Sequence, residues 1–330
     1  MSRKLMAQRM SRRSGSPWRG CGIVFTKEFS DHLRSPRMLV LEWLILLTGI
    51  GAVFISIQGL RTTTAQDPFL FLRLFTDARE SMPSFLAVLG FLIPLMAIGL
   101  GFDSINGEFN RRTMSRVLAQ PIYRDALLLG KFAGGLATLA VGLVTLWLLI
   151  IGLGLLRLGV PPSGEEVARG FVFLCVAVAY GGVWLSVAML CSVVCRSPAT
   201  AALSALGAWL LLSLLWPLMA RFLAEIIYPP TDVAILLGIQ SPQQIGLQQM
   251  LARLSPSTLF GEAVIGMLQP ATRTFGVVFS SQVQGAVAGA PLSFGQSLLL
   301  VWPQFTGLIA GAIILFAVSY MAFQRKEVRA

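Results

Sequence analysis

The chain has 330 residues, of which 55% are hydrophobic and only 12% are charged, and its formal net charge at pH 7 is +11. Its mean hydropathy is +0.74. Soluble domains carry roughly 25% charged residues, so this composition excludes a soluble globular domain and predicts an integral membrane protein.

Residues 1–37 form a basic cytoplasmic head with nine Lys and Arg residues against the acids Glu28 and Asp31. Over residues 23–33 apolar and charged side chains alternate at helical spacing, which predicts an amphipathic helix lying in the headgroup plane. His32 is the only histidine. Because no second His or Cys stands at metal-ligand spacing from it, we interpret it as an interfacial side chain and not as a ligand or base.

Six apolar runs are long enough to cross a bilayer, whose hydrocarbon core of roughly 30 Å needs about 20 helical residues. The first run has no small-x-small cleavage site behind it, so we expect it to remain as an anchor. Glu42 near its start is expected to snorkel to the interface, with a transport role as the alternative. The predicted transmembrane helices are residues 38–60, 84–102, 132–156, 167–195, 199–220 and 297–323.

Residues 101–131 form a charged segment between the second and third predicted spans. Thr113 can cap a helix and Pro121 removes a backbone donor, so a short amphipathic helix is predicted over residues 113–119. Its basic side holds Arg111, Arg112 and Arg116, and its apolar side holds Met114, Val117 and Leu118. From physical chemistry alone, this segment is either a structured contact surface or a solvated basic loop that only follows membrane topology.

A family resemblance favours the first reading. The run FDSINGE, then a basic turn with a threonine, then VLAQPIYRDALLLGKF resembles the cytoplasmic loop of ABC-2 permeases of ATP-binding-cassette exporters, which carries the coupling helix. The family pattern is kept at Glu108, Thr113, Pro121, Ile122 and Arg124, and it changes at Asn110, Arg112, Met114 and Tyr123. The resemblance implies that an ATPase contacts Glu108, Arg111, Arg112, Thr113, Met114, Arg116, Val117 and Leu118.

The outer side is expected to hold a segment at 61–83, a tight turn near 161–166 and a long segment at 221–296. Asp67-Pro68 predicts the start of a short helix that grazes the bilayer as a lid or surface strut. Ser255-Pro256 predicts a second helix, ended by Pro270, on whose polar side Glu262 is solvated. The run LSPSTLFGEAVIGML resembles the outer segment before the last span in the multicopper-enzyme-maturation branch of the family.

Charge counting predicts the orientation. With both termini inside, the inner segments hold eighteen Lys and Arg residues against seven acids, a balance of +11, whereas the outer segments hold eight against eight. Such an excess is the positive-inside signature of a multi-pass protein of the cytoplasmic membrane. It explains the basic pI without nucleic acid, so no nucleic-acid partner is expected.

The energy source follows from motifs that the sequence lacks. The interiors of the second to sixth predicted spans hold no Asp, Glu, Lys, Arg or His, so no proton relay is predicted. The single Gly-Lys pair, Gly130-Lys131, is followed by Phe132 and cannot form a P-loop. No hydrolase or metal motif is present either. We therefore expect a chain without cofactors or enzymatic activity, with ATP and Mg²⁺ bound by a separate subunit.

Two functions remain open. The first is an exporting permease domain over residues 38–330, paired with a second copy or a homologous permease and moved by an ABC ATP-binding subunit. The second is a scaffold or force-transmitting subunit that acts on an extracytoplasmic partner without translocation. A secondary transporter is the third and weakest reading.

Overall fold

The computed structural model describes residues 20–60, 69–76, 85–111, 123–159, 161–230, 240–270, 272 and 291–325. Within these ranges all regular structure is helical, as the sequence predicts for an all-α protein. The helices are α2 (Cys21–Arg34), α3 (Pro36–Leu60), α4 (Leu70–Thr76), α5 (Phe85–Gly101), α6 (Asn106–Asn110), α8 (Arg124–Leu158), α9 (Gly164–Val194), α10 (Pro198–Leu210), the π-helix η1 (Leu211–Leu215), α11 (Trp216–Ile227), α13 (Pro242–Ala252), α14 (Pro256–Leu268) and α16 (Phe294–Arg325).

Within the described ranges, five helices are long and apolar enough to cross a membrane. They are Phe85–Asn110, Arg124–Arg157, Gly164–Val194, Pro198–Ile227 and Phe294–Arg325. These correspond to the second to sixth predicted spans. The first predicted span is also a helix, α3, of 25 residues, but it is not one of the five, so a total of six spans stays a prediction.

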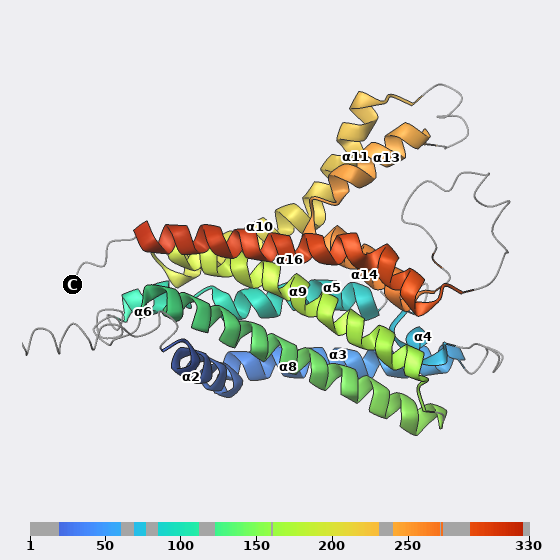
Figure 1. Cartoon of the computed structure of the whole chain (residues 1–330), viewed down its shortest axis with the longest axis horizontal. Coiled ribbons are helices and arrows are strands. Elements are labelled where there is room, and N and C mark those ends of the chain that lie inside the picture. The colour runs from blue at the N-terminus through green and yellow to red at the C-terminus, as the bar shows by residue number, and fades with distance from the viewer. Residues whose placement is uncertain are drawn as a thin grey trace, which may run out of the picture.

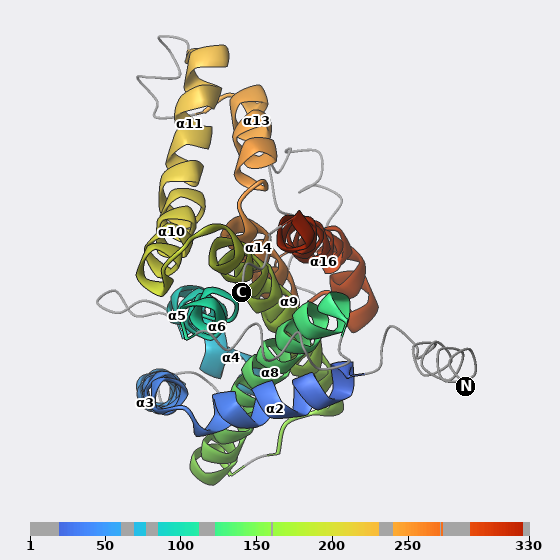
Figure 2. The same cartoon turned by 90° about the vertical axis from the view of Figure 1, so that its left-hand side faces the viewer.

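Helix α9 lies at the centre of the bundle, between α5, α8, α14 and α16 (Figure 2). Close approach of its neighbours depends on small residues. A Cβ atom on Gly181 would lie 2.5 Å from a methyl carbon of Leu139 on α8, a distance that no real Cβ tolerates. The absence of a side chain at this position lets α8 and α9 pack tightly.

The fifth helix continues past its predicted end at residue 220. One π-helical turn, Leu211–Leu215, connects α10 to α11, which runs on to Ile227. Trp216-Pro217 does not close the helix, because Pro217 stands in the first turn of α11, where a missing N–H costs little. Beyond this turn α11 and α13 project together from the bundle as a two-helix arm (Figure 1).

Helix α4 is the short helix predicted after Asp67-Pro68, but it packs inward. Phe71, Leu74 and Phe75 are buried in the hydrophobic core. Its backbone is held by Glu166, whose carboxylate accepts from the N–H of Phe71 at 2.8 Å and also forms the capping box of α9. The helix is therefore packed into the bundle beside the start of α9 and is not a surface strut.

Arg169, near the start of α9, is a buried cation that sequence analysis did not single out. Its side chain is 0% exposed and pairs with Glu165 at 2.8 Å. It also donates to the carbonyl oxygens of Met267 at 3.0 Å and Leu292 at 2.7 Å, and to Ser297 Oγ at 2.9 Å. One guanidinium thus ties α9 to the end of α14 and the start of α16.

Helix α14 forms as predicted after Ser255-Pro256, with Phe260, Val264 and Met267 among its buried residues. The expectation that Glu262 is solvated was wrong. Its carboxylate accepts from Arg253 Nε at 2.9 Å and from Gln304 Nε2 at 2.9 Å. Because both partners come from other segments, Glu262 fixes α14 against α16 instead of facing water.

Candidate functional site

The candidate site lies at the end of the bundle where α2, α6, the start of α8 and the end of α16 meet, which we call the loop end (Figure 1). The predicted charged segment 101–131 begins and ends there. Its described residues are 101–111 and 123–131.

Helix α2 crosses α8 at two glycines. A Cβ atom on Gly130 would lie 2.8 Å from the Cβ of Val24, and one on Gly134 would lie 3.0 Å from the Cβ of Glu28. The Gly-xxx-Gly spacing of Gly130 and Gly134, which allows close helix contact, therefore receives the predicted interfacial helix. The close crossing brings Glu28 down onto the neighbouring Lys131.

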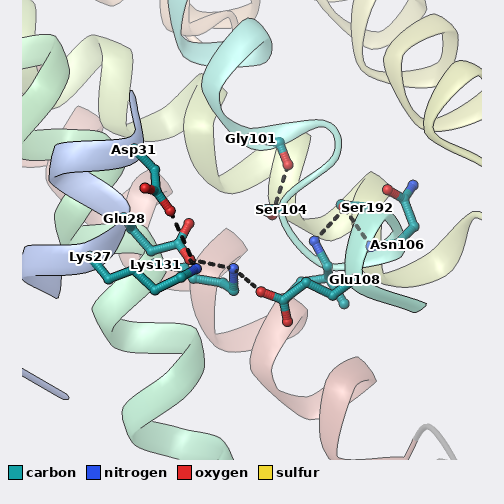
Figure 3. A network of polar contacts seen from close by, with 10 residues as sticks. Lys27, Glu28, Asp31, Gly101, Ser104, Asn106, Glu108, Lys131 and Ser192 are labelled. Atoms are coloured by element: carbon teal, nitrogen blue, oxygen red, sulfur yellow. Dashed lines mark hydrogen bonds and ion pairs between the residues drawn. The ribbon is translucent and has the colours of Figure 1, made fainter. Parts of the chain in front are cut away.

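Lys131 is the centre of a buried ion cluster (Figure 3). Its Nζ lies 2.8 Å from Glu28 Oε1 on α2 and 2.7 Å from Glu108 Oε1 on α6, and its side chain is only 3% exposed. Lys27 reaches the same Glu28 oxygen at 3.1 Å from the solvent side, and it lies 3.4 Å from Asp31. Three helices that are separate in sequence thus share one buried cation.

The surroundings shift the pKa values of the α2 side chains. Burial alone would raise the pKa of Glu28, but Lys131 and then Lys27 outweigh it and hold that pKa below its usual 4.5. Burial would likewise lower the pKa of Lys27, and the nearby carboxylates raise it above 10.5 instead. Burial, aided by Lys131, lowers the pKa of His32 below 6.5 despite the acids around it. At neutral pH Glu28 and Lys27 are therefore charged, and His32 is neutral.

The start of the charged segment is anchored from two sides. Ser192 Oγ on α9 accepts from the backbone N–H groups of Ile105 at 3.0 Å and Asn106 at 3.2 Å (Figure 3). Arg37, in the first turn of α3, pairs with Asp103 at 2.9 Å. Helix α6 is consequently connected to α3, α8 and α9 at once.

A cavity of about 450 Å³ opens beside the ion cluster. Its charged wall includes Glu28, Asp103, Glu108 and Lys131, and its apolar wall includes Leu41 and Leu100. The cavity lies between α2, α3, α5 and α6, so relative movement of α2 and α6 would change its shape.

The structure describes two of the residues implied to contact an ATPase. Arg111 is exposed at the end of α6, whereas Glu108 is paired with Lys131 inside the chain. Arg112, Thr113, Met114, Arg116, Val117 and Leu118 lie outside the described residues, and the predicted helix at 113–119 stays a prediction.

Sequence analysis did not foresee the roles of Glu28 and Lys131. Lys131 was named only in the Gly-Lys pair at the end of the charged segment, and Glu28 was named only as an acid of the basic head. The available signal was the position of Lys131 directly after the first glycine of the Gly-xxx-Gly pair, where a crossing helix must pass close to it.

The chain is similar in sequence to known proteins. The family model described as "ABC-2 family transporter protein" matches residues 23–328. The probable ABC transporter permease protein NosY of Stutzerimonas stutzeri is 28% identical over 202 residues, which cover 59% of this chain and 67% of the relative. The protein of the same name from Pseudomonas aeruginosa is 28% identical over 205 residues, covering 59% of this chain and 69% of the relative.

Proposed function

Because the chain belongs to the ABC-2 transporter family, and so is a membrane subunit of an ABC transporter, we propose that a separate ATP-binding subunit drives it by docking on residues 101–131. In this proposal the chain exports a substrate across the cytoplasmic membrane and works as a pair, either with a second copy or with a homologous permease. ATP and Mg²⁺ bind to the partner subunit.

The observation that carries the proposal is the ion cluster at the loop end. Glu108 belongs to the segment that would receive the ATPase, and it shares Lys131 with Glu28 of the interfacial helix. A displacement of the segment would therefore move α2 and α8 together, because separating either carboxylate from Lys131 breaks one of the buried ion pairs of that lysine. The ATPase stroke would pass from the docking segment directly into a transmembrane helix.

The partner copy is proposed to cover the fifth helix. Only 11% of the apolar window of Pro198–Ile227 is buried within the chain, against 67% for α9. Its exposed side chains form a nearly continuous apolar face along α10, η1 and α11: Leu203, Leu210, Leu211, Leu214, Leu215, Leu218, Met219, Phe222 and Ile226. Such a face needs either lipid or protein against it.

The arm formed by α11 and α13 favours a second candidate function. It projects sideways from the bundle (Figure 2) and offers a lever to a protein on the outer side. In this alternative the ATPase moves the arm and nothing crosses the bilayer. ATPase activity that an outer-side protein stimulates in detergent, where no compartments exist, would favour it over transport.

Co-purification with the ATP-binding subunit tests the docking proposal. The double change Met114→Asp with Leu118→Asp should release the ATPase, because two charges would enter an apolar contact. A matched control is Met250→Asp with Leu254→Asp, which alters two exposed residues with the same spacing at the arm. Loss of a single central anchor, as in Leu118→Ala, should weaken binding by on the order of thirtyfold.

The expected complex contains two permease chains and two ATPase chains by mass. If the Met114/Leu118 variant inserts normally and still retains the ATPase at wild-type stoichiometry, the segment does not dock the ATPase and the solvated-loop reading holds. A complex with a single permease chain would show that the protein does not work as a pair of permeases.

A further inference from the structure

An apolar slot between α8, α9 and α16 is not used by the proposed function. At the loop end α8 and α16 are held together, because Asp125 Oδ1 accepts from Tyr320 OH at 3.0 Å and from Gln324 Nε2 at 2.6 Å. The rings of Phe132 and Phe316 meet just above, with centroids 4.8 Å apart. Both rings line a cavity of about 600 Å³ that extends further between the two helices.

The back wall of the slot includes several small side chains, which leave room in it. Cys175, Ala179 and Gly182 follow each other at helical spacing on α9, and Ala312 faces them from α16. Larger apolar residues form the sides: Leu129, Leu136 and Val144 on α8, Phe171 on α9, and Phe305, Ile309 and Ile313 on α16. No ionisable side chain other than the Cys175 thiol is among the lining residues.

The slot runs lengthwise through the part of the bundle that spans the membrane. Along α8 it extends from residue 129 to residue 144, fifteen residues that correspond to about 22 Å at 1.5 Å per residue. This is about three quarters of a hydrocarbon core of roughly 30 Å. All three walls belong to helices that are long and apolar enough to cross the bilayer, so the open side of the slot faces hydrocarbon.

The dimensions decide between possible occupants. A volume of about 600 Å³ spread over about 22 Å gives a mean cross-section of roughly 27 Å², whereas a helix with side chains, about 10 Å across, needs roughly 80 Å². A whole helix of a second copy therefore cannot sit inside the slot. Water is excluded because an apolar cavity offers it no hydrogen-bond partners, and an empty slot would lose the dispersion contacts of its walls.

We propose that this slot binds one acyl chain of a membrane phospholipid, aligned with α8 and α16. The acyl chain fills the space between α8 and α16, which among the described residues contact each other at the loop end and are bridged elsewhere by α9. Bound lipid would then set the separation of α8 and α16, and α8 is the helix that carries Lys131. The site is a specific one, in contrast to the exposed face of α3, which lipid covers without a cavity.

Photo-crosslinking tests the proposal on the full chain in nanodiscs of phosphatidylcholine with a diazirine on one acyl chain. Peptide mass spectrometry should find severalfold more label on the slot peptides of α8, α9 and α16 than on exposed residues of α3 such as Val40 and Leu47. Ala179→Phe fills the slot and should reduce its labelling to the α3 level. The control Leu148→Phe changes an exposed residue of α8 that does not line the slot, and it should leave the labelling unchanged.

Equal labelling of the slot and the α3 face in the wild-type chain would overturn the proposal, as would unchanged slot labelling in a folded Ala179→Phe variant. Should Ala179→Phe fail to fold, Ala312→Leu fills the same slot from the opposite wall and is read in the same way. Slot residues that stay unlabelled while they crosslink to a second permease chain would assign the slot to protein contact instead.

Discussion

Two lysines share one carboxylate oxygen at the loop end, and burial decides how much each contributes. Lys131 and Lys27 lie 2.8 Å and 3.1 Å from Glu28 Oε1, but their side chains are 3% and 61% exposed. The exposed pair is screened by water and gains little. Removal of the buried lysine breaks two ion pairs at once, those with the desolvated carboxylates of Glu28 and Glu108.

We therefore predict that Lys131→Met destabilises the protein by about 3–5 kcal/mol, as expected when one partner of a buried ion pair is lost. Lys27→Met, the matched control on the same carboxylate, should cost no more than about 1 kcal/mol. Thermal unfolding of the two variants in one detergent gives the comparison. Equal losses of stability would show that the buried cluster is not a stabilising centre.

The crossing of α2 over α8 depends on the absence of a side chain at Gly130. Gly130 and Gly152 both lie inside α8, so they have the same intrinsic preference against the helix. They differ in their surroundings: an added Cβ would meet Val24 at 2.8 Å at Gly130, and nothing within 4 Å at Gly152. The two glycines separate backbone propensity from helix contact.

Gly152→Ala should stabilise the protein by up to about 1 kcal/mol, because alanine favours the helix more than glycine does. Gly130→Ala should instead destabilise it by about 1–3 kcal/mol, since the added methyl group forces α2 away from α8. Unfolding midpoints of both variants test this contrast. A Gly130→Ala variant as stable as the wild type would mean that α2 does not pack against this glycine.

The fifth helix shows how an element-scale feature redirects a chain. The π-helical turn at Leu211–Leu215 is wider than an α-helical turn and often marks a functional position. The helix passes through it and then leaves the bundle to form the arm. Within the arm, Nε1 of Trp216 on α11 donates to the carbonyl oxygen of Leu251 on α13 at 2.8 Å. From the residue types alone, the fifth helix was expected to end at residue 220.

At the scale of the whole molecule the remaining question is its orientation in the membrane. The charge balance of +11 against zero predicts that the loop end is cytoplasmic and that the arm lies outside. Ser257, which stands in the outer segment, is a poor position for a label because its hydroxyl is bonded to Tyr180 at 2.9 Å and to Ser213 at 2.5 Å inside the bundle. Gln243 on α13 is exposed and suits the purpose.

In a cysteine-free background, Gln243→Cys should react with an impermeant maleimide in intact cells, whereas Ser115→Cys should react only after the membrane is opened. The expected order follows from the excess of Lys and Arg at the loop end. If Ser115→Cys labels first from outside, the charge-based orientation is wrong, and so is the proposed side of ATPase docking.

The sequence alone determined the protein class, the positions of most spanning helices and the family. Long apolar runs and their flanking charges are local properties, and their physical meaning does not depend on what packs against them. The start of α14 at Ser255-Pro256 and the packing use of Gly130 and Gly134 were predictable for the same reason.

Only the tertiary structure decided which charges are buried and which helices share them. Glu28, Glu108 and Lys131 stand on three helices, and the sequence holds no information on their separation until the crossing of α2 over α8 is known. In the sequence, Arg169 is one of several charged residues at the ends of predicted spans. It is fully buried because α14 and the residues just before α16 present carbonyl groups to it. A charge is tolerated inside a protein when the fold supplies its partners, and those partners come from distant parts of the chain.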